Sequence, residues 1–182
     1  MRNVILALCL TASPALATGL DIEVSGEANG TIHIDLFEDV APGHVERLTT
    51  LAADGSYDGV VFHRVIDGFM AQTGDVANGK TGGDLSRAGY GGSDLPDLEQ
   101  EFSDKPFIRG TVGMARSGNS VDSANSQFFI MFNSAPHLDG QYTVVGEVTS
   151  GMDVVDAIKR GSPRSGAIKG DPDVMSKVTV TE

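Results

Sequence analysis

The chain of 182 residues lacks tryptophan and has one cysteine, Cys9, which falls within the first 17 residues. Without a second cysteine it can form no internal disulfide, and removal of those residues would leave no thiol nucleophile or thiolate metal ligand. Basic residues are also scarce, with 13 Lys and Arg against 25 Asp and Glu. The net charge of −12 argues against nucleic acid or an anionic membrane as the main partner.

The four histidines do not have the spacing of common zinc sites. His33, His44, His63 and His137 form no H-x-x-x-H or H-E-x-x-H pair, so we expect neither a structural nor a catalytic zinc ion. A serine hydrolase is also disfavoured, because no G-x-S-x-G elbow surrounds Ser126 or any other serine.

Long hydrophobic runs are absent apart from Val4–Leu10, which follows a basic start and is too short to span a bilayer. The small-x-small sequence Ala15–Ala17 comes soon after it. This pattern is typical of a secretory signal peptide, so we predict a signal over residues 1–17 and one exported domain over 18–182. A lipid anchor at Cys9 is the alternative, but the large Leu8 before it is unusual for such a site.

The remaining composition favours one globular, β-rich domain. Apolar residues make up 40% of the chain, glycine is abundant with 23 residues, and no repeat or change of composition follows residue 17. Apolar periodicity predicts strands over 20–24, 31–37, 60–66, 69–72, 111–115, 126–132, 142–148 and 174–181, and helices over 41–53 and 152–160. A long loop is expected over 76–94. These elements fit a mainly antiparallel β-barrel with a helix near each end.

One stretch, residues 60–75, combines strand-forming residues with an arginine. Alternation places Phe62, Arg64 and Ile66 on one face, and Asp67-Gly68 predicts a tight turn. A hairpin that presents an arginine with phenylalanine, methionine and glutamine would form an apolar hollow with a fixed hydrogen-bond donor. The alternative is a hairpin whose arginine only extends to water.

A phosphate-loop pattern, G-x-x-x-x-G-K-[ST], occurs over Gly74–Thr81. The function of that loop requires a helix that begins at its Lys-Thr pair. Gly82 and Gly83 follow immediately and start a helix poorly. We therefore interpret the match as a coincidence in a glycine-rich chain.

Three segments, Phe62–Asp75, Gly110–Ile130 and His137–Gly146, occur in an order and spacing that resembles the cyclophilins. These are the cyclosporin-binding family of peptidyl-prolyl cis-trans isomerases. The resemblance runs from about Thr31 to the C-terminus and is closest to exported bacterial members, which implies a periplasmic location. It also implies a closed eight-stranded antiparallel β-barrel capped by two α-helices, in agreement with the periodicity.

The resemblance also implies a site. Arg64 matches the catalytic arginine of the family. The matched substrate-binding positions are Phe69, Met70, Gln72, Ala115, Arg116, Gln127, Phe129, His137, Leu138 and Tyr142. The apolar members would hold a proline ring, and Gln72 with the backbone near Arg116 would hold the substrate carbonyl. The family match assigns Phe128 to the core. The reaction needs no metal, cofactor or covalent intermediate.

Four positions depart from the family pattern. Asp67 stands where proline is frequent, Arg116 replaces a frequent asparagine, and Tyr142 replaces a histidine. His137 occupies the place of a tryptophan that helps many members bind cyclosporin. We therefore expect weak cyclosporin binding with activity retained.

Two functions remain open from the sequence. The first is an isomerase that assists the folding of exported, proline-containing polypeptides as a monomer. The second is a non-catalytic module or chaperone that binds proline-containing segments, with loop 76–94 as an additional contact surface. Arg64 favours the first, because a binder has no need of that donor.

Overall fold

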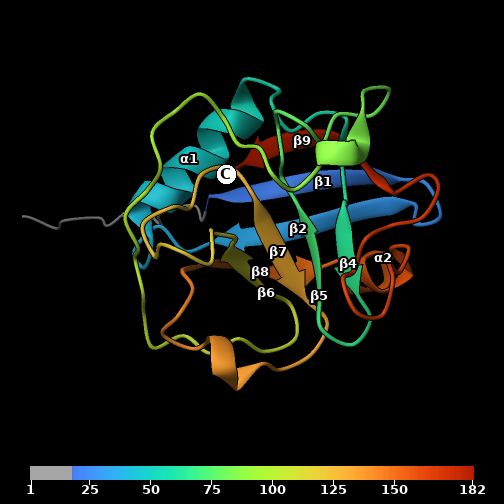
Figure 1. Ribbon diagram of the computed structural model, residues 1–182. Coiled ribbons are helices and arrows are strands. Elements are labelled where there is room, and N and C mark those ends of the chain that lie inside the picture. Colours follow the sequence, from blue (N-terminus) through green and yellow to red (C-terminus); the bar gives the residue numbers. More distant parts are fainter. Residues whose placement is uncertain (1–17) are drawn as a thin grey trace, which may run out of the picture.

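All nine strands of the computed structural model, which describes residues 18–182, belong to one antiparallel sheet (Figure 1). The strands are β1 (Gly19–Ser25), β2 (Gly30–Leu36), β3 (Val60–Val61), β4 (Arg64–Ile66), β5 (Met70–Thr73), β6 (Thr111–Met114), β7 (Phe128–Met131), β8 (Val144–Ser150) and β9 (Val174–Thr181). Their order in the sheet is β3-β9-β1-β2-β8-β6-β7-β5-β4. The signal peptide predicted for residues 1–17 lies outside the described residues.

The two edges of the sheet, β3 and β4, are consecutive pieces of chain joined by Phe62 and His63. The sequence predicted a single strand over 60–66 and eight strands in total. Phe62 and His63 interrupt the predicted strand and divide it into β3 and β4, so the sheet has nine strands. The two edge strands are joined by these two residues of chain and do not pair with each other through hydrogen bonds. The interruption also shifts the alternation, because Phe62 and Val65 both lie in the core. The predicted shared face of Phe62 and Arg64 was therefore wrong.

The other predicted strands are confirmed, with ends that move by one or two residues. Strands β1 and β2 form a hairpin, with Leu20 opposite Ile34 and Ile22 opposite Ile32. The apolar residues of both strands point to the same side because alternate residues share a face.

Two α-helices, α1 (Pro42–Ala53) and α2 (Met152–Ala157), lie at opposite ends of the curled sheet (Figure 1), and both pack against the same core. Helix α1 has the predicted bounds within one residue and begins with Pro42, whose fixed φ suits a first turn. Helix α2 ends three residues earlier than predicted. Ile158 is extended, and the Lys159 amide donates to the buried Asp173 carboxylate at 2.6 Å instead of continuing the helix. Two short 3₁₀ helices, η1 (Leu85–Arg87) and η2 (Pro136–Leu138), complete the elements.

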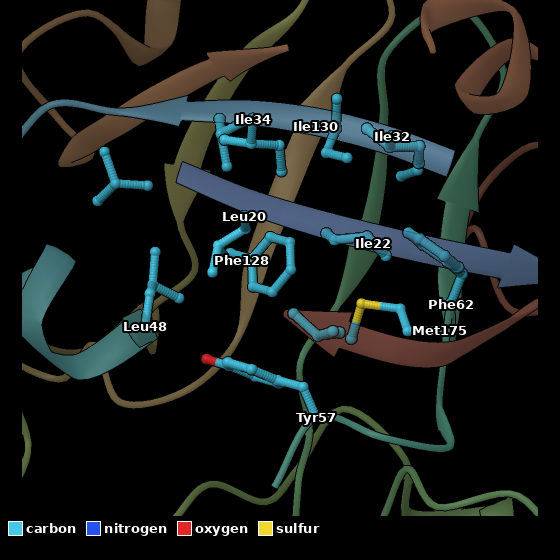
Figure 2. Packing of buried hydrophobic residues seen from close by; sticks show 14 of the residues in the cluster. Leu20, Ile22, Ile32, Ile34, Leu48, Tyr57, Phe62, Phe128, Ile130 and Met175 are labelled. Carbon is cyan, nitrogen blue, oxygen red and sulfur yellow. The ribbon is translucent and has the colours of Figure 1, made fainter. Parts of the chain in front are cut away.

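The main core lies inside the curled sheet (Figure 2). Side chains of β1, β2 and β7 meet there, among them Leu20, Ile22, Ile32, Ile34, Phe128 and Ile130. The Tyr57 and Phe128 rings pack edge to face with centroids 5.7 Å apart. The Tyr57 hydroxyl donates to the Ser126 carbonyl at 2.7 Å, so this buried polar group is satisfied. Phe128 belongs to the core, as predicted.

In the segment with the phosphate-loop pattern, no helix begins at the Lys80-Thr81 pair. The Lys80 ammonium instead donates to the backbone carbonyls of Ser56 and Asp58, each at 2.6 Å. The Lys80 ammonium therefore connects its own turn to the turn that contains Ser56 and Asp58. Among the helices of residues 18–182, none combines the length and the apolar character needed to cross a membrane.

Candidate functional site

The register of the sheet aligns four residues across neighbouring strands. Arg64 of β4 lies opposite Gln72 of β5, Gln72 lies opposite Phe129 of β7, and Phe129 lies opposite Gly113 of β6. Directly opposite residues project from the same face of a sheet. One face therefore presents a guanidinium, an amide, an aromatic ring and a position without a side chain, in that order.

A chain of hydrogen bonds connects the polar members of this row. The Arg64 Nη1 donates to Gln72 Oε1 at 3.1 Å, and Gln72 Nε2 donates to Gln127 Oε1 at 2.9 Å. The Gln127 Nε2 then donates to the carbonyls of Gly91 at 2.8 Å and Gly89 at 3.1 Å. Because guanidinium groups only donate and carbonyls only accept, each amide has one possible orientation. We call Arg64, Gln72 and Gln127 the hydrogen-bond chain.

The far end of the hydrogen-bond chain rests on loop 76–94, which buried Asp75 anchors. The Gly89 and Gly91 amides donate to Asp75 Oδ2 at 2.7 and 2.9 Å, and the Asn78 amide donates to Asp75 Oδ1 at 2.8 Å. A carboxylate that accepts several amide hydrogen bonds holds a loop firmly. This part of the loop therefore positions Gln127.

The other side of Arg64 is held by a segment remote in sequence. Its Nε donates to the Ser165 carbonyl at 3.1 Å, across 101 residues of chain. Gly166 has φ +75°, and a Cβ there would lie 2.9 Å from Arg64 Cγ, so only glycine fits this close approach. Sequence reasoning missed Ser165 and Gly166, because small residues in a turn do not indicate which strand they approach.

The guanidinium of Arg64 is half-buried, and this burial lowers its pKa below the ordinary value while leaving it charged near neutral pH. Its Nη1 also lies 3.7 Å from the Met70 sulfur. Within residues 18–182, the Nη2 atom donates to no acceptor. The side chain is therefore fixed through Nε and Nη1 and keeps a donor for a further group.

A second group of apolar residues, which we call the aromatic cluster, packs beside the hydrogen-bond chain. It contains Met70, Phe107, Phe129, Met131, Ala135, Leu138 and Val144, with Phe37, Ile66, Phe69, Ala115 and Tyr142 packed against it. The Phe107 and Phe129 rings stack with centroids 5.7 Å apart, and Tyr142 meets Phe129 edge to face at 5.8 Å. Such pairs stabilise beyond their buried area.

Phe107 is a member of the aromatic cluster that sequence reasoning missed. It lies in an irregular segment without periodicity, and its amide donates to the Asp139 carboxylate at 2.8 Å. Gly113 makes room for it, because a Cβ at that position would lie 2.5 Å from Phe107 and 2.7 Å from Phe129. The only sequence signal was an aromatic residue placed between Pro106 and Ile108.

Two predicted residues lie at the edges of the aromatic cluster. The exposed His137 ring stacks on Phe69 with centroids 5.9 Å apart. The Arg116 guanidinium lies 4.5 Å above the Tyr142 ring and donates to the Gln141 carbonyl at 3.1 and 3.2 Å. Arg116 therefore holds the loop that carries Tyr142.

All the predicted site residues thus lie in one region. Arg64, Gln72 and Gln127 form the hydrogen-bond chain, Phe69, Met70, Ala115, Phe129, Leu138 and Tyr142 belong to or pack on the aromatic cluster, and Arg116 and His137 lie at its edges. Their roles in binding and catalysis remain predictions.

A cavity of about 620 Å³ adjoins this region and is lined by Gln72, Ala115, Arg116, Gln127 and the loop around 89–93. Its size is in the range of pockets that take small molecules or peptide side chains. In the part of the chain from residue 18 onward, no group of three or more His, Cys, Asp or Glu side chains is arranged to hold a metal ion.

Comparison with known proteins gives a family for this arrangement. The family model described as cyclophilin type peptidyl-prolyl cis-trans isomerase/CLD matches residues 19–181. A probable peptidyl-prolyl cis-trans isomerase of Brucella suis is 57% identical over 155 residues, which cover 84% of this chain and 78% of the relative. A peptidyl-prolyl cis-trans isomerase of Helicobacter pylori is 41% identical over 134 residues, 72% of this chain and 76% of that protein.

Solved structures show the same fold. A cyclophilin type peptidyl-prolyl cis-trans isomerase of Cryptosporidium parvum, crystallised in the presence of the dipeptide Ala-Pro, superposes with a TM-score of 0.76 and 24% identity. The match covers 90% of this chain and 99% of that one. A cyclophilin of Hirschia baltica gives a TM-score of 0.71 at 24% identity, over 88% of this chain and 73% of that chain.

Proposed function

The chain belongs to the cyclophilin-type peptidyl-prolyl cis-trans isomerases, and we propose that it accelerates rotation about X-Pro bonds in exported polypeptides, with Arg64 as the catalytic donor. The observation that carries the proposal is the position of Arg64. Its Nε and Nη1 are fixed by Ser165 and Gln72, and a guanidinium donor remains beside the aromatic cluster.

The reaction requires only that one rotation barrier be lowered. The peptide bond has partial double-bond character, with a barrier of about 18–20 kcal/mol. The cis and trans forms before proline differ by only about 0.5–1 kcal/mol, so no energy source is needed. A site that binds the twisted bond more tightly than either planar form accelerates the rotation in both directions.

Arg64 provides that preference through its remaining donor. When the bond twists, resonance is lost and the proline nitrogen regains a lone pair that can accept a hydrogen bond. A guanidinium donor close to that nitrogen stabilises the twisted state and gains little from the planar one. Since the guanidinium stays charged near neutral pH, the reaction needs no titrating base.

The aromatic cluster and Gln72 supply the complementary contacts. Phe69, Met70, Phe129 and Leu138 hold the proline ring by apolar contact, which fixes one side of the rotating bond. The Gln72 amide nitrogen has two hydrogens, and its hydrogen bond to Gln127 uses one. The second is available to the carbonyl of the residue before proline. The Ala-Pro dipeptide used with the Cryptosporidium parvum relative supports recognition of this chemistry.

The test is two-dimensional exchange NMR on a blocked Ala-Ala-Pro-Ala peptide with the purified protein and its Arg64→Ala variant. We expect kcat/KM to fall by about 10²–10³-fold in the variant, as when a transition-state hydrogen-bond donor is removed. The exposed Arg87→Ala serves as the matched control and should keep the wild-type rate. Peptide binding without faster exchange in the wild type would instead favour the non-catalytic binding module or chaperone.

Location and partners are part of the proposal. The basic start, apolar run and Ala15–Ala17 of the N-terminal sequence support export to the periplasm. The clients are then proline-containing exported polypeptides, whose uncatalysed isomerisation takes tens of seconds. His137 in place of a tryptophan supports weak cyclosporin binding, and we propose that the protein acts as a monomer.

A further inference from the structure

A second cavity, of about 570 Å³, is lined by Arg64 and Gln72 and by further residues to which the reaction above assigns no role. Its walls come from η1, from β4 and from the segment before β9. Leu85, Ala88, Ala167, Ile168 and Pro172 supply apolar surface to it.

The lining of this cavity contains no carboxylate, although the chain carries 25 acidic residues and a net charge of −12. Its titratable side chains are His63, Arg64 and Tyr90. Burial of His63 lowers the pKa of its imidazole, so the ring is neutral near pH 7. Both ring nitrogens of His63 are buried, so the imidazole offers the cavity no exposed hydrogen-bonding atom. The apolar residues of the lining therefore give the cavity a surface that suits an apolar group, beside the charged Arg64.

The cavity is continuous with the proposed catalytic site, because Arg64 and Gln72 line it as well. The Arg64 side chain is held there by hydrogen bonds from Nη1 to Gln72 and from Nε to Ser165. A polypeptide whose proline lies beside Arg64 can therefore place a neighbouring side chain in this cavity.

Tyr90 lines both this cavity and the first one and is 85% exposed. Among residues 18–182 it is the most exposed of the large apolar and aromatic side chains. Tyrosine provides a rigid contact surface at low entropic cost and is enriched where proteins bind peptides. Because Tyr90 lines both cavities, a polypeptide that contacts its ring can reach from one cavity to the other.

We propose that this cavity is a specificity site that binds a large apolar side chain, such as phenylalanine or leucine, of the client polypeptide near the proline. The inference rests on the proposed function, since it concerns the same substrate on the same face. The occupant packs against Leu85 and Ile168 and against the aliphatic part of Arg64. Clients with such a residue are isomerised with higher kcat/KM than clients without it.

The test uses a nine-residue alanine-serine host peptide with a central proline and one phenylalanine, moved through the four positions on either side. Exchange NMR gives kcat/KM for each peptide with the wild-type protein, Leu85→Ala and Leu95→Ala. Leu85 lies in η1 and is not fully buried, so its truncation leaves the core intact. Leu95 is a matched leucine of the same region that does not line the cavity.

We expect phenylalanine at one or two positions to raise kcat/KM about fivefold over alanine there, as expected for partial burial of its side chain. In Leu85→Ala this gain should fall below about twofold, while the rate on the short Ala-Ala-Pro-Ala peptide stays unchanged. Leu95→Ala should retain the full gain. Equal rates for all positions, or a gain that persists in Leu85→Ala, would overturn the proposal.

A second readout separates this inference from the proposed function. With methyl-labelled protein, the favoured peptide should shift the resonances of Leu85 and Ile168, and Tyr90→Ala should weaken that binding. If the wild type fails to accelerate exchange in any peptide yet these shifts appear, the proposed function is wrong and the binding site stands. If exchange is accelerated but no peptide shifts these methyl groups, the site is wrong and the isomerase stands.

Discussion

Gln72 lies between two groups that permit only one orientation of its amide. Arg64 can only donate to it, and Gln127 must present its oxygen because two backbone carbonyls occupy its nitrogen. The Arg64 guanidinium is thus positioned by Gln72, which is itself positioned by Gln127, and neither of these two side chains is charged. At the scale of single residues, the geometry of the proposed donor depends on neutral amides rather than on an ion pair.

Replacing Gln72 with alanine should therefore lower kcat/KM on Ala-Ala-Pro-Ala by about tenfold, because a hydrogen bond to a charged group contributes about 1.5–3 kcal/mol. The thermal midpoint should change little, since the side chain is only partly buried. Gln141→Ala is the matched control, because that side chain is exposed. An unchanged rate in Gln72→Ala, measured by exchange NMR, would show that the orientation of Arg64 does not depend on the amide.

At the scale of elements, β6 makes room for the aromatic cluster because it has a glycine, Gly113, where another residue would carry a side chain. Gly113 is buried in the middle of β6, opposite Phe129. The stacked pair of Phe107 and Phe129 occupies the space that a side chain at this position would fill. A strand interior normally disfavours glycine, so its presence here reflects the close approach of the two rings.

Gly113→Ala should destabilise the fold by about 1–3 kcal/mol, the usual cost of overpacking a core, and should also lower activity by displacing Phe129. Urea denaturation and exchange NMR measure the two effects. Gly118→Ala is the control, because a Cβ at Gly118 meets no atom within 4 Å and its φ is not positive. Equal stability of the two variants would contradict the packing argument.

Helix α1 begins without a side-chain cap of its own. The Glu101 carboxylate, which is remote in sequence, takes the place of a cap. It accepts hydrogen bonds from the Gly43 and His44 amides, each at 3.1 Å, and from the His44 ring at 2.6 Å. Burial opposes ionisation of Glu101, but these hydrogen bonds outweigh it and hold its pKa below the ordinary value. A carboxylate from an irregular segment thus stabilises the positive end of the helix dipole.

Glu101→Gln should therefore lower the free energy of unfolding by about 1–2 kcal/mol near neutral pH. Because the folded-state pKa is depressed, the carboxylate stabilises the fold above the unfolded pKa of about 4.5, and this stabilisation is lost as the pH falls through the folded value. The difference in the free energy of unfolding between wild type and Glu101→Gln, measured by urea denaturation, should decrease as the pH is lowered. Glu99 is an exposed neighbour, so Glu99→Gln should unfold with the same free energy as the wild type at every pH.

At the scale of the whole molecule, local patterns predicted most elements but not how remote segments meet. The alternation of apolar and polar residues predicted nearly all strands. The family resemblance predicted Arg64, Gln72 and Gln127, the members of the hydrogen-bond chain, as site residues. The division of the strand at Phe62 and His63 was missed, because both residues fit a continuous strand pattern. The contact of Arg64 with Ser165 was missed as well, since periodicity carries no information about partners 101 residues apart.

The sheet also depends on the last strand of the chain. Strand β9 lies between β3 and β1 and pairs with both, so its loss would leave two strands without a partner on that side. Deleting residues 174–182 should therefore abolish the folded state, visible as collapse of the amide dispersion in NMR spectra. Deleting only Glu182, which lies outside β9, is the control. A folded, dispersed spectrum from the longer deletion would contradict this interpretation.

The position of β9 also determines when the protein can fold. At about 5–20 residues per second, synthesis produces β9 on the order of 10 s after β1. Throughout that interval β1 of the nascent chain lacks its β9 partner, so the sheet cannot be completed until residues 174–181 have been synthesised. This delay suits the export proposed above, because an export machinery would meet the chain before the fold forms.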